Sequence, residues 1–135
     1  MSVEQNKAVI RRLFEEVRNK GNFDIIPELI SPNFVYRDHK GPEGFRENTI
    51  MWRTRFPDLK RTIIDMVGEG DIVAMRDRFH GTLTGKWLGV EPTGRLVDYQ
   101  LSHFFRFEDG KVVEMLVFAN MLEFNKQAGL TPPNS

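Results

Sequence analysis

The chain has 135 residues, the length of one domain, and its 19 basic residues are balanced by 19 acidic ones. This balance, without any basic run, argues against nucleic acid or an anionic membrane surface as a partner. The absence of cysteine excludes disulfides, thiolate metal sites and cysteine nucleophiles. There is no signal-peptide pattern and no apolar run long enough to span a membrane, so we expect a single cytoplasmic domain over residues 1–135.

The first half of the chain has helical patterns. Ser2 and Gln5 have the spacing of a capping box, and apolar residues recur at helical intervals over residues 3–20. A short second helix is predicted to end at residue 29. A third helix is predicted over residues 41–56, because it opens with Gly-Pro and ends before a second proline.

The second half has the features of strands. They are predicted over residues 59–67, 72–84, 96–107 and 111–119. Asp109-Gly110 between the last two is a strong hairpin signal, and a short helix follows over residues 121–128. Helices followed by an antiparallel meander indicate an α+β fold, in which a curved sheet packs against three to four helices and can enclose a hydrophobic pocket.

The alternation of side chains places two titratable groups on the inner face of this sheet. In the longest strand, His103 shares a parity with Tyr99 and Leu101, and in the preceding strand Asp77 shares one with Met75. If the two groups are neighbours, the histidine becomes an acid or base that is tunable near neutral pH. Alternatively, a bulge turns Asp77 to the polar face, and His103 is an ordinary hydrogen-bonded core residue.

Further aromatic and apolar residues are candidates for the pocket wall. Phe14 and Trp52 lie on the inner stripes of the first and third helices, Tyr36 lies on a short extended segment, and Trp87 lies in a glycine-rich loop. In the last strand Val117 belongs to the inner parity, with Val113, Met115 and Ala119. Leu116 and Phe118 then fall on the outer face, where they need cover, which suggests a homodimer.

No metal or cofactor signature accompanies these candidates. The histidines, His39, His80 and His103, lack metal-ligand spacing, and there is no P-loop, dinucleotide-binding or serine-hydrolase motif. We therefore expect a site without a metal or a cofactor, whose ligand is a hydrophobic small molecule.

Several segments together resemble a known family. They are N-K-G-N-F-D at residues 19–24, G-P-E-G-F at 41–45, F-P-D-L at 56–59, G-T-L-T-G-K-W-L-G-V-E-P-T-G-R at 81–95 and F-R-F-E-D-G-K-V-V-E at 105–114. The chain resembles the SnoaL-like polyketide cyclases over residues 5–129. That resemblance implies the nuclear-transport-factor-two-like fold, a cone of curved antiparallel sheet and helices that is usually dimeric through the outer face of the sheet.

The resemblance also implies a chemistry, an intramolecular aldol condensation that closes a ring of an aromatic polyketide without a cofactor. His103 matches the family's pocket histidine, and Tyr36 matches a pocket-lining position of the first strand. The family's catalytic aspartate falls at Val117. A later acidic position is Asn120, and a histidine that many relatives have is Leu83.

Three functions remain open at this point. The first is a cyclase or isomerase in which Asp77 is the base, His103 its partner or an acid, and Tyr36 or Tyr99 a donor to the developing oxyanion. The second is a non-catalytic ligand-binding or dimeric interaction module that has lost the carboxylate. The third is an epoxide-hydrolase-type enzyme, which the adjacent Arg76 and Asp77 match poorly because they point to opposite faces.

Overall fold

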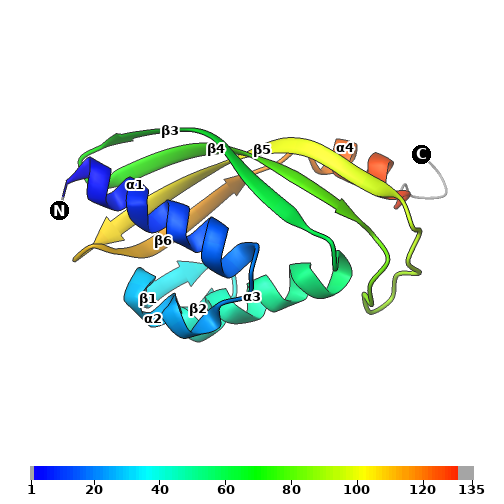
Figure 1. Ribbon diagram of the computed structural model, residues 1–135, viewed down its shortest axis with the longest axis horizontal. Helices are drawn as coiled ribbons and strands as arrows, with labels where there is room; N and C mark the ends of the chain where they lie inside the picture. Colours follow the sequence, from blue (N-terminus) through cyan, green and yellow to red (C-terminus); the bar gives the residue numbers. More distant parts are fainter. Residues whose placement is uncertain (1, 131–135) are drawn as a thin grey trace.

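A curved six-stranded sheet with helices along one face forms the body of the molecule (Figure 1). The computed structural model describes residues 2–130. Helices α1, α2 and α3 lie on one side of the sheet, and α4 packs against β5 near one end. This arrangement confirms the predicted α+β class. Among the described residues, no helix is long and apolar enough to cross a membrane.

The helical segments are α1 (Val3–Arg12), the π-helical η1 (Leu13–Arg18), the 3-10 turn η2 (Phe23–Ile25), α2 (Ile26–Leu29), α3 (Gly41–Arg55) and α4 (Met121–Ala128). The strands are β1 (Ile30–Tyr36), β2 (His39–Lys40), β3 (Lys60–Glu69), β4 (Ile72–Thr82), β5 (Leu96–Glu108) and β6 (Lys111–Phe118). The capping box is present as predicted, because the Gln5 N–H donates to the Ser2 hydroxyl and the Ser2 N–H donates to the Gln5 side chain.

The strand order is β2-β1-β6-β5-β4-β3, and the four strands from β3 to β6 form the expected antiparallel meander. The sheet is not wholly antiparallel, however, because β1 pairs with β6 in parallel. A hairpin forces its two strands to run in opposite directions, but β1 is separated from β6 by α3 and four strands. That long connection allows the parallel pairing.

Burial along β4 and β5 follows the predicted parity. Val73, Met75, Asp77 and Phe79 are buried on β4, and their partners on β5 face the same layer. On β6 one expectation was wrong. A bulge opposite Arg106 and Phe107 moves Val112 into the core in place of Val113.

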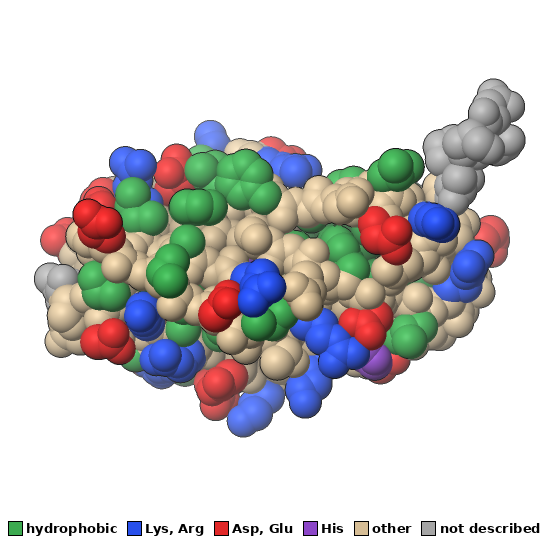
Figure 2. All heavy atoms as spheres, turned by 90° about the horizontal axis from the view of Figure 1, so that it is seen from above, with side chains coloured by type: hydrophobic (Ala, Val, Ile, Leu, Met, Phe, Trp, Pro, Cys, Tyr) green, Lys and Arg blue, Asp and Glu red, His purple; other side chains and the backbone are tan. Residues whose placement is uncertain are grey.

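The outer face of the sheet carries hydrophobic side chains among charged ones (Figure 2). Phe104, Leu116 and Phe118 are each more than two-fifths exposed there. The inner face instead packs against the helices, and its buried side chains form the core. The curvature of the sheet leaves part of this layer unfilled, and the candidate site occupies that space.

Candidate functional site

A cavity of about 190 Å³ lies between the inner face of the sheet and the segments η1 and α3. Six residues predicted for the pocket or its chemistry line it, namely Tyr36, Trp52, Tyr99, Leu101, His103 and Val117. Arg37 and Met121 also line it and are exposed, which places the mouth of the cavity between the end of β1 and the start of α4. The wall thus combines rings and aliphatic groups with a few polar side chains, as small-molecule sites do.

Four other predicted residues lie behind this wall. Phe14 packs edge-on against the His103 ring, with centroids 5.6 Å apart, and Met75 is buried opposite His103 in the strand register. Trp87 packs edge-on against Trp52. The Asp77 side chain is completely buried and reaches the cavity only through its neighbours.

Those neighbours are Arg61 and His103, which flank Asp77 on the inner face. Asp77 pairs with Ile63 of β3 and Leu101 of β5. Arg61 lies two residues before Ile63, and His103 lies two residues after Leu101. Such diagonal positions are within reach of long or aromatic side chains. The Nε of Arg61 donates to Oδ2 of Asp77 at 2.9 Å, and Nη2 donates to the same oxygen.

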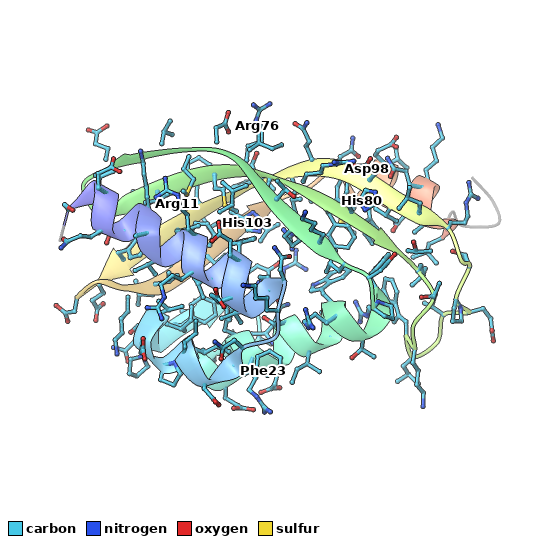
Figure 3. All side chains as sticks on the ribbon, viewed as in Figure 1. Arg11, Phe23, Arg76, His80, Asp98 and His103 are labelled. Carbon is cyan, nitrogen blue, oxygen red and sulfur yellow. The ribbon has the colours of Figure 1, made fainter. Side chains whose placement is uncertain are left out.

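His103 completes this cluster from the other side. Its Nδ1 lies 2.9 Å from Oδ1 of Asp77, although the N–H is poorly aligned with that oxygen. Because Nδ1 faces the carboxylate, Nε2 is the nitrogen left to the cavity. Figure 3 shows His103 between the sheet and the helices, whereas Arg76 points away on the opposite side. Asp77 and His103 are therefore neighbours on the inner face, without a well-aligned hydrogen bond between them.

Burial and charge act in opposite directions on these groups. Burial alone would raise the pKa of Asp77, but Arg61 and His103 outweigh it and hold that pKa below its ordinary value. Burial lowers the pKa of His103, and the nearby carboxylate offsets this only in part. The cluster is therefore an Asp77–Arg61 ion pair beside a neutral imidazole at pH 7.

Arg18 brings a second buried guanidinium to the cavity, and it comes from the π-helical segment. The Asn19 N–H donates to the carbonyl of Phe14, five residues back, so the turn holds one extra residue and Arg18 is buried with Val17. Nη1 of Arg18 donates to Asn48 at 2.8 Å and to Thr49 at 3.0 Å. Burial lowers the Arg18 pKa to about 9, and Arg61 adds to the effect.

Asn19 links the two arginines. Its side chain accepts from the backbone N–H of Arg61 at 2.7 Å and donates to the Arg61 carbonyl at 2.8 Å. These two bonds fix the end of η1 against the start of β3. Sequence reasoning missed both arginines. For Arg61, the available signal was its shared parity with Ile63 before the β3 bulge, and for Arg18 it was the helical spacing of four residues from Phe14.

Tyr99, on β5, is another polar cavity-lining residue whose pKa is clearly shifted. Burial raises its pKa to about 12, so its hydroxyl remains protonated and able to donate a hydrogen bond. Within residues 2–130, no group of three or more His, Asp or Glu side chains is placed to hold a metal ion. The cavity thus offers an imidazole, hydroxyl donors, the Asn48 amide and arginines among its polar groups.

Comparison with known proteins assigns this architecture to a family. Residues 8–128 match the SnoaL-like polyketide cyclases, so the chain belongs to that family. It is 30% identical over 114 residues to the aklanonic acid methyl ester cyclase AcmA of Streptomyces galilaeus, and the match covers 78% of this chain and 77% of AcmA.

Solved structures agree with this assignment. A protein from Jannaschia sp. CCS1 that is assigned as a SnoaL-like polyketide cyclase superposes with a TM-score of 0.84 at 28% identity, over 98% of each chain. AclR from Streptomyces galilaeus, which is assigned as a hydroxylase, superposes with a TM-score of 0.79 at 29% identity, over 97% of this chain and all of AclR. Proteins assigned to different reactions therefore share this fold at similar identity.

The buried ion pair leads to a stability prediction. Changing Asp77 to Asn leaves the Arg61 charge buried without a carboxylate, which we expect to cost about 3–5 kcal/mol of unfolding free energy at pH 7. Urea unfolding measures this cost. The matched control is Asp98→Asn, which removes the partner of Arg78 on the exposed outer face and should cost far less. Equal losses in the two variants would contradict the role of the pair.

The lowered pKa of His103 gives a pH dependence of stability. An unfolded histidine titrates near about 6.5, so the unfolded state binds more protons between that value and the lower folded pKa. The unfolding free energy should therefore fall as the pH drops through this window and level off below the folded pKa. Urea unfolding between pH 8 and 5 measures the slope, which His103→Asn should flatten. An unchanged slope in His103→Asn would refute the assignment.

Proposed function

We propose that this protein binds a hydrophobic carbonyl compound in the cavity and catalyses acid/base chemistry on it with its own side chains. The reaction class is an aldol-type cyclisation or an isomerisation of a polyketide-like substrate. The observation that carries the proposal is His103, a neutral imidazole that lines the cavity and has a buried carboxylate behind it. Membership of the SnoaL-like polyketide cyclase family supports the same class.

The geometry suggests roles that differ from the sequence-based ones. Asp77 was expected to be the base, but it does not line the cavity, and Arg61 already holds one of its oxygens. We assign the base to Nε2 of His103, and Asp77 becomes a positioning residue that orients the ring and stabilises its protonated form. This is the division of roles found in histidine–carboxylate pairs of other enzymes.

The proposed reaction needs only proton transfers. His103 removes a proton from the carbon next to a carbonyl, and the electron pair of that C–H bond forms an enolate. The Tyr99 hydroxyl and the Arg61 guanidinium line the same cavity and can stabilise its negative oxygen. In a cyclisation, the enolate carbon attacks a second carbonyl to form the new C–C bond, and the resulting alkoxide takes the proton back from His103.

One observation favours a non-catalytic alternative. Val117 pairs directly with His103 in the strand register, and none of the cavity-lining residues in the described chain is Asp or Glu. A protein with this cavity can bind its ligand and leave it unchanged. The epoxide-hydrolase-type reaction gains no such support, because it requires carboxylates that reach a water molecule in the cavity.

We also propose that two copies associate through the outer face of the sheet. Val67, Ala74, Phe104 and Leu116 lie in one register row across β3, β4, β5 and β6. The Phe118 ring packs edge-on against Phe104, with centroids 5.8 Å apart, and extends the row. A row of apolar side chains across an exposed face is typical of a self-association surface. Figure 2 shows this face with its hydrophobic side chains lying among charged ones.

Turnover tests the catalytic proposal. We expect His103→Gln to lower the rate about 10²–10⁴-fold, the usual effect of removing a general base. Suitable assays are cyclisation of aklanonic acid methyl ester, chosen because AcmA is named for it, and exchange of the α-protons of 2-tetralone in heavy water. The exchange assay needs only proton removal and therefore does not depend on the natural substrate.

The control for this experiment is His80→Gln, which changes a histidine on the opposite parity of the sheet. Circular dichroism verifies that both variants are folded. Binding of both compounds to wild-type protein without turnover or exchange would favour the non-catalytic alternative. Equal rates in His103→Gln and wild-type protein would refute the role of His103.

Oligomeric state tests the outer-face proposal. We expect wild-type protein to sediment as a dimer and Phe118→Glu to sediment as a monomer, because a charge buried in an apolar interface lacks a partner. Leu88→Glu is a matched control, since Leu88 is 96% exposed in the loop between β4 and β5. A monomeric wild-type protein, or a Phe118→Glu variant that remains dimeric, would exclude this interface.

A further inference from the structure

The buried charges of the inner layer do not balance. Within the described residues, the charged side chains buried there are two arginines, Arg18 and Arg61, and one aspartate, Asp77. Asp77 is committed to Arg61 through two hydrogen bonds, and His103 is neutral at pH 7 because burial lowers its pKa. One buried positive charge therefore has no carboxylate of its own. Such a charge is costly unless a counter-charge reaches it.

Arg18 carries this uncompensated charge. It is only 4% exposed, and its hydrogen-bond partners, Asn48 and Thr49, are both neutral. Its Nε is buried and has no hydrogen-bond partner in the described part of the chain. A guanidinium offers five N–H donors in a planar fork that matches a carboxylate, and here that capacity is not saturated by the protein.

The side chains that line the cavity also carry more positive than negative charge. It includes Arg18, Arg61 and, at the mouth, Arg37, whereas no acidic side chain from residues 2–130 contributes to it. The cation–π contact of Arg18 with Phe45, at 4.4 Å, stabilises the guanidinium where it lies but supplies no negative charge. The remaining wall is largely apolar, with Trp52 and Leu101 among its members.

We infer that Arg18 is an anion-binding group and that the ligand of this cavity is an aromatic or polycyclic compound with a free carboxylate. This inference rests on the proposed function and narrows its substrate class. The carboxylate pairs with Arg18 on the helix wall, and the apolar body of the ligand lies against the rings and aliphatic groups. A cavity of about 190 Å³ holds one or two fused rings, and a larger ligand extends through the mouth beside Arg37.

The relative AcmA is named for a methyl ester, in which this negative charge is masked. The inference therefore predicts that the present chain differs from AcmA in selecting the free acid. An ester presents no full charge to a buried guanidinium. A charged subsite should therefore bind the free acid more tightly than its methyl ester, whereas an apolar subsite should not.

The test compares 2-naphthoate with methyl 2-naphthoate by isothermal titration calorimetry at pH 7.5. We expect wild-type protein to bind the acid roughly 10-fold or more tightly than the ester, the effect of one charge-assisted contact. Arg18→Met keeps much of the side-chain length and should bring the two affinities within about threefold of each other. Arg11→Met is the matched control, since it removes the same charge from the exposed side of α1 and should leave the preference intact.

A second readout separates ligand binding from a purely structural role. 2-Naphthoate should raise the thermal midpoint of wild-type protein but not that of Arg18→Met. If Arg18 only supports Asn48 and Thr49, the variant loses stability and keeps the preference for the acid, which overturns the inference. Equal or tighter binding of the ester to wild-type protein overturns it too, while the proposed carbonyl chemistry stands. Failure of both compounds to bind counts against the inference and the proposed function together.

Discussion

The Asp77–Arg61 ion pair is the constraint on which the inner face of the sheet depends. A carboxylate with no exposure to water is tolerated only beside a counter-charge and hydrogen-bond donors, and Arg61 supplies both from the adjacent strand. The pair also fixes register, because a slip of one residue in β3 or β4 would turn one partner to the outer face. The same carboxylate lies beside His103 on the next strand, so a single buried charge has neighbours on both flanking strands, one of which is the imidazole that lines the cavity.

Sequence could predict this much of the site because β4 and β5 alternate regularly. Strict period-two burial placed Asp77 and His103 on one face, and the Asp-Gly turn fixed the hairpin that follows. Both arginines were missed because they lie next to irregularities. Arg61 precedes the β3 bulge, and Arg18 ends a π-helical segment, although its spacing of four residues from Phe14 also places it beside the apolar stripe of a regular helix. The parallel pairing of β1 was missed for a related reason, since no local turn determines its direction.

The two walls of the cavity have different physical characters. The sheet wall is rigid and hydrogen-bonded, and it carries the imidazole with its buried counter-ion. The helix wall carries Arg18, which is held by two neutral side chains of α3 and is anchored to β3 through Asn19. Asn19 belongs to the N-K-G-N-F-D segment that contributed to the family resemblance. The first residue of that segment therefore joins the end of η1 to the start of β3.

The fold and the residues that line its cavity can vary separately, and one fold can therefore accommodate different reactions. Relatives assigned as a cyclase and as a hydroxylase share the architecture with this chain at 28–29% identity, so the same framework occurs in proteins assigned to different reactions. In this chain Val117 stands opposite His103, where the family resemblance places an acid, and the polar lining is left predominantly cationic. A carboxylate at that position would line the same cavity as the two buried guanidinium groups and add a negative charge to it. We propose that the ligand supplies the counter-charge in its absence, so that Val117 also affects which ligands the cavity favours.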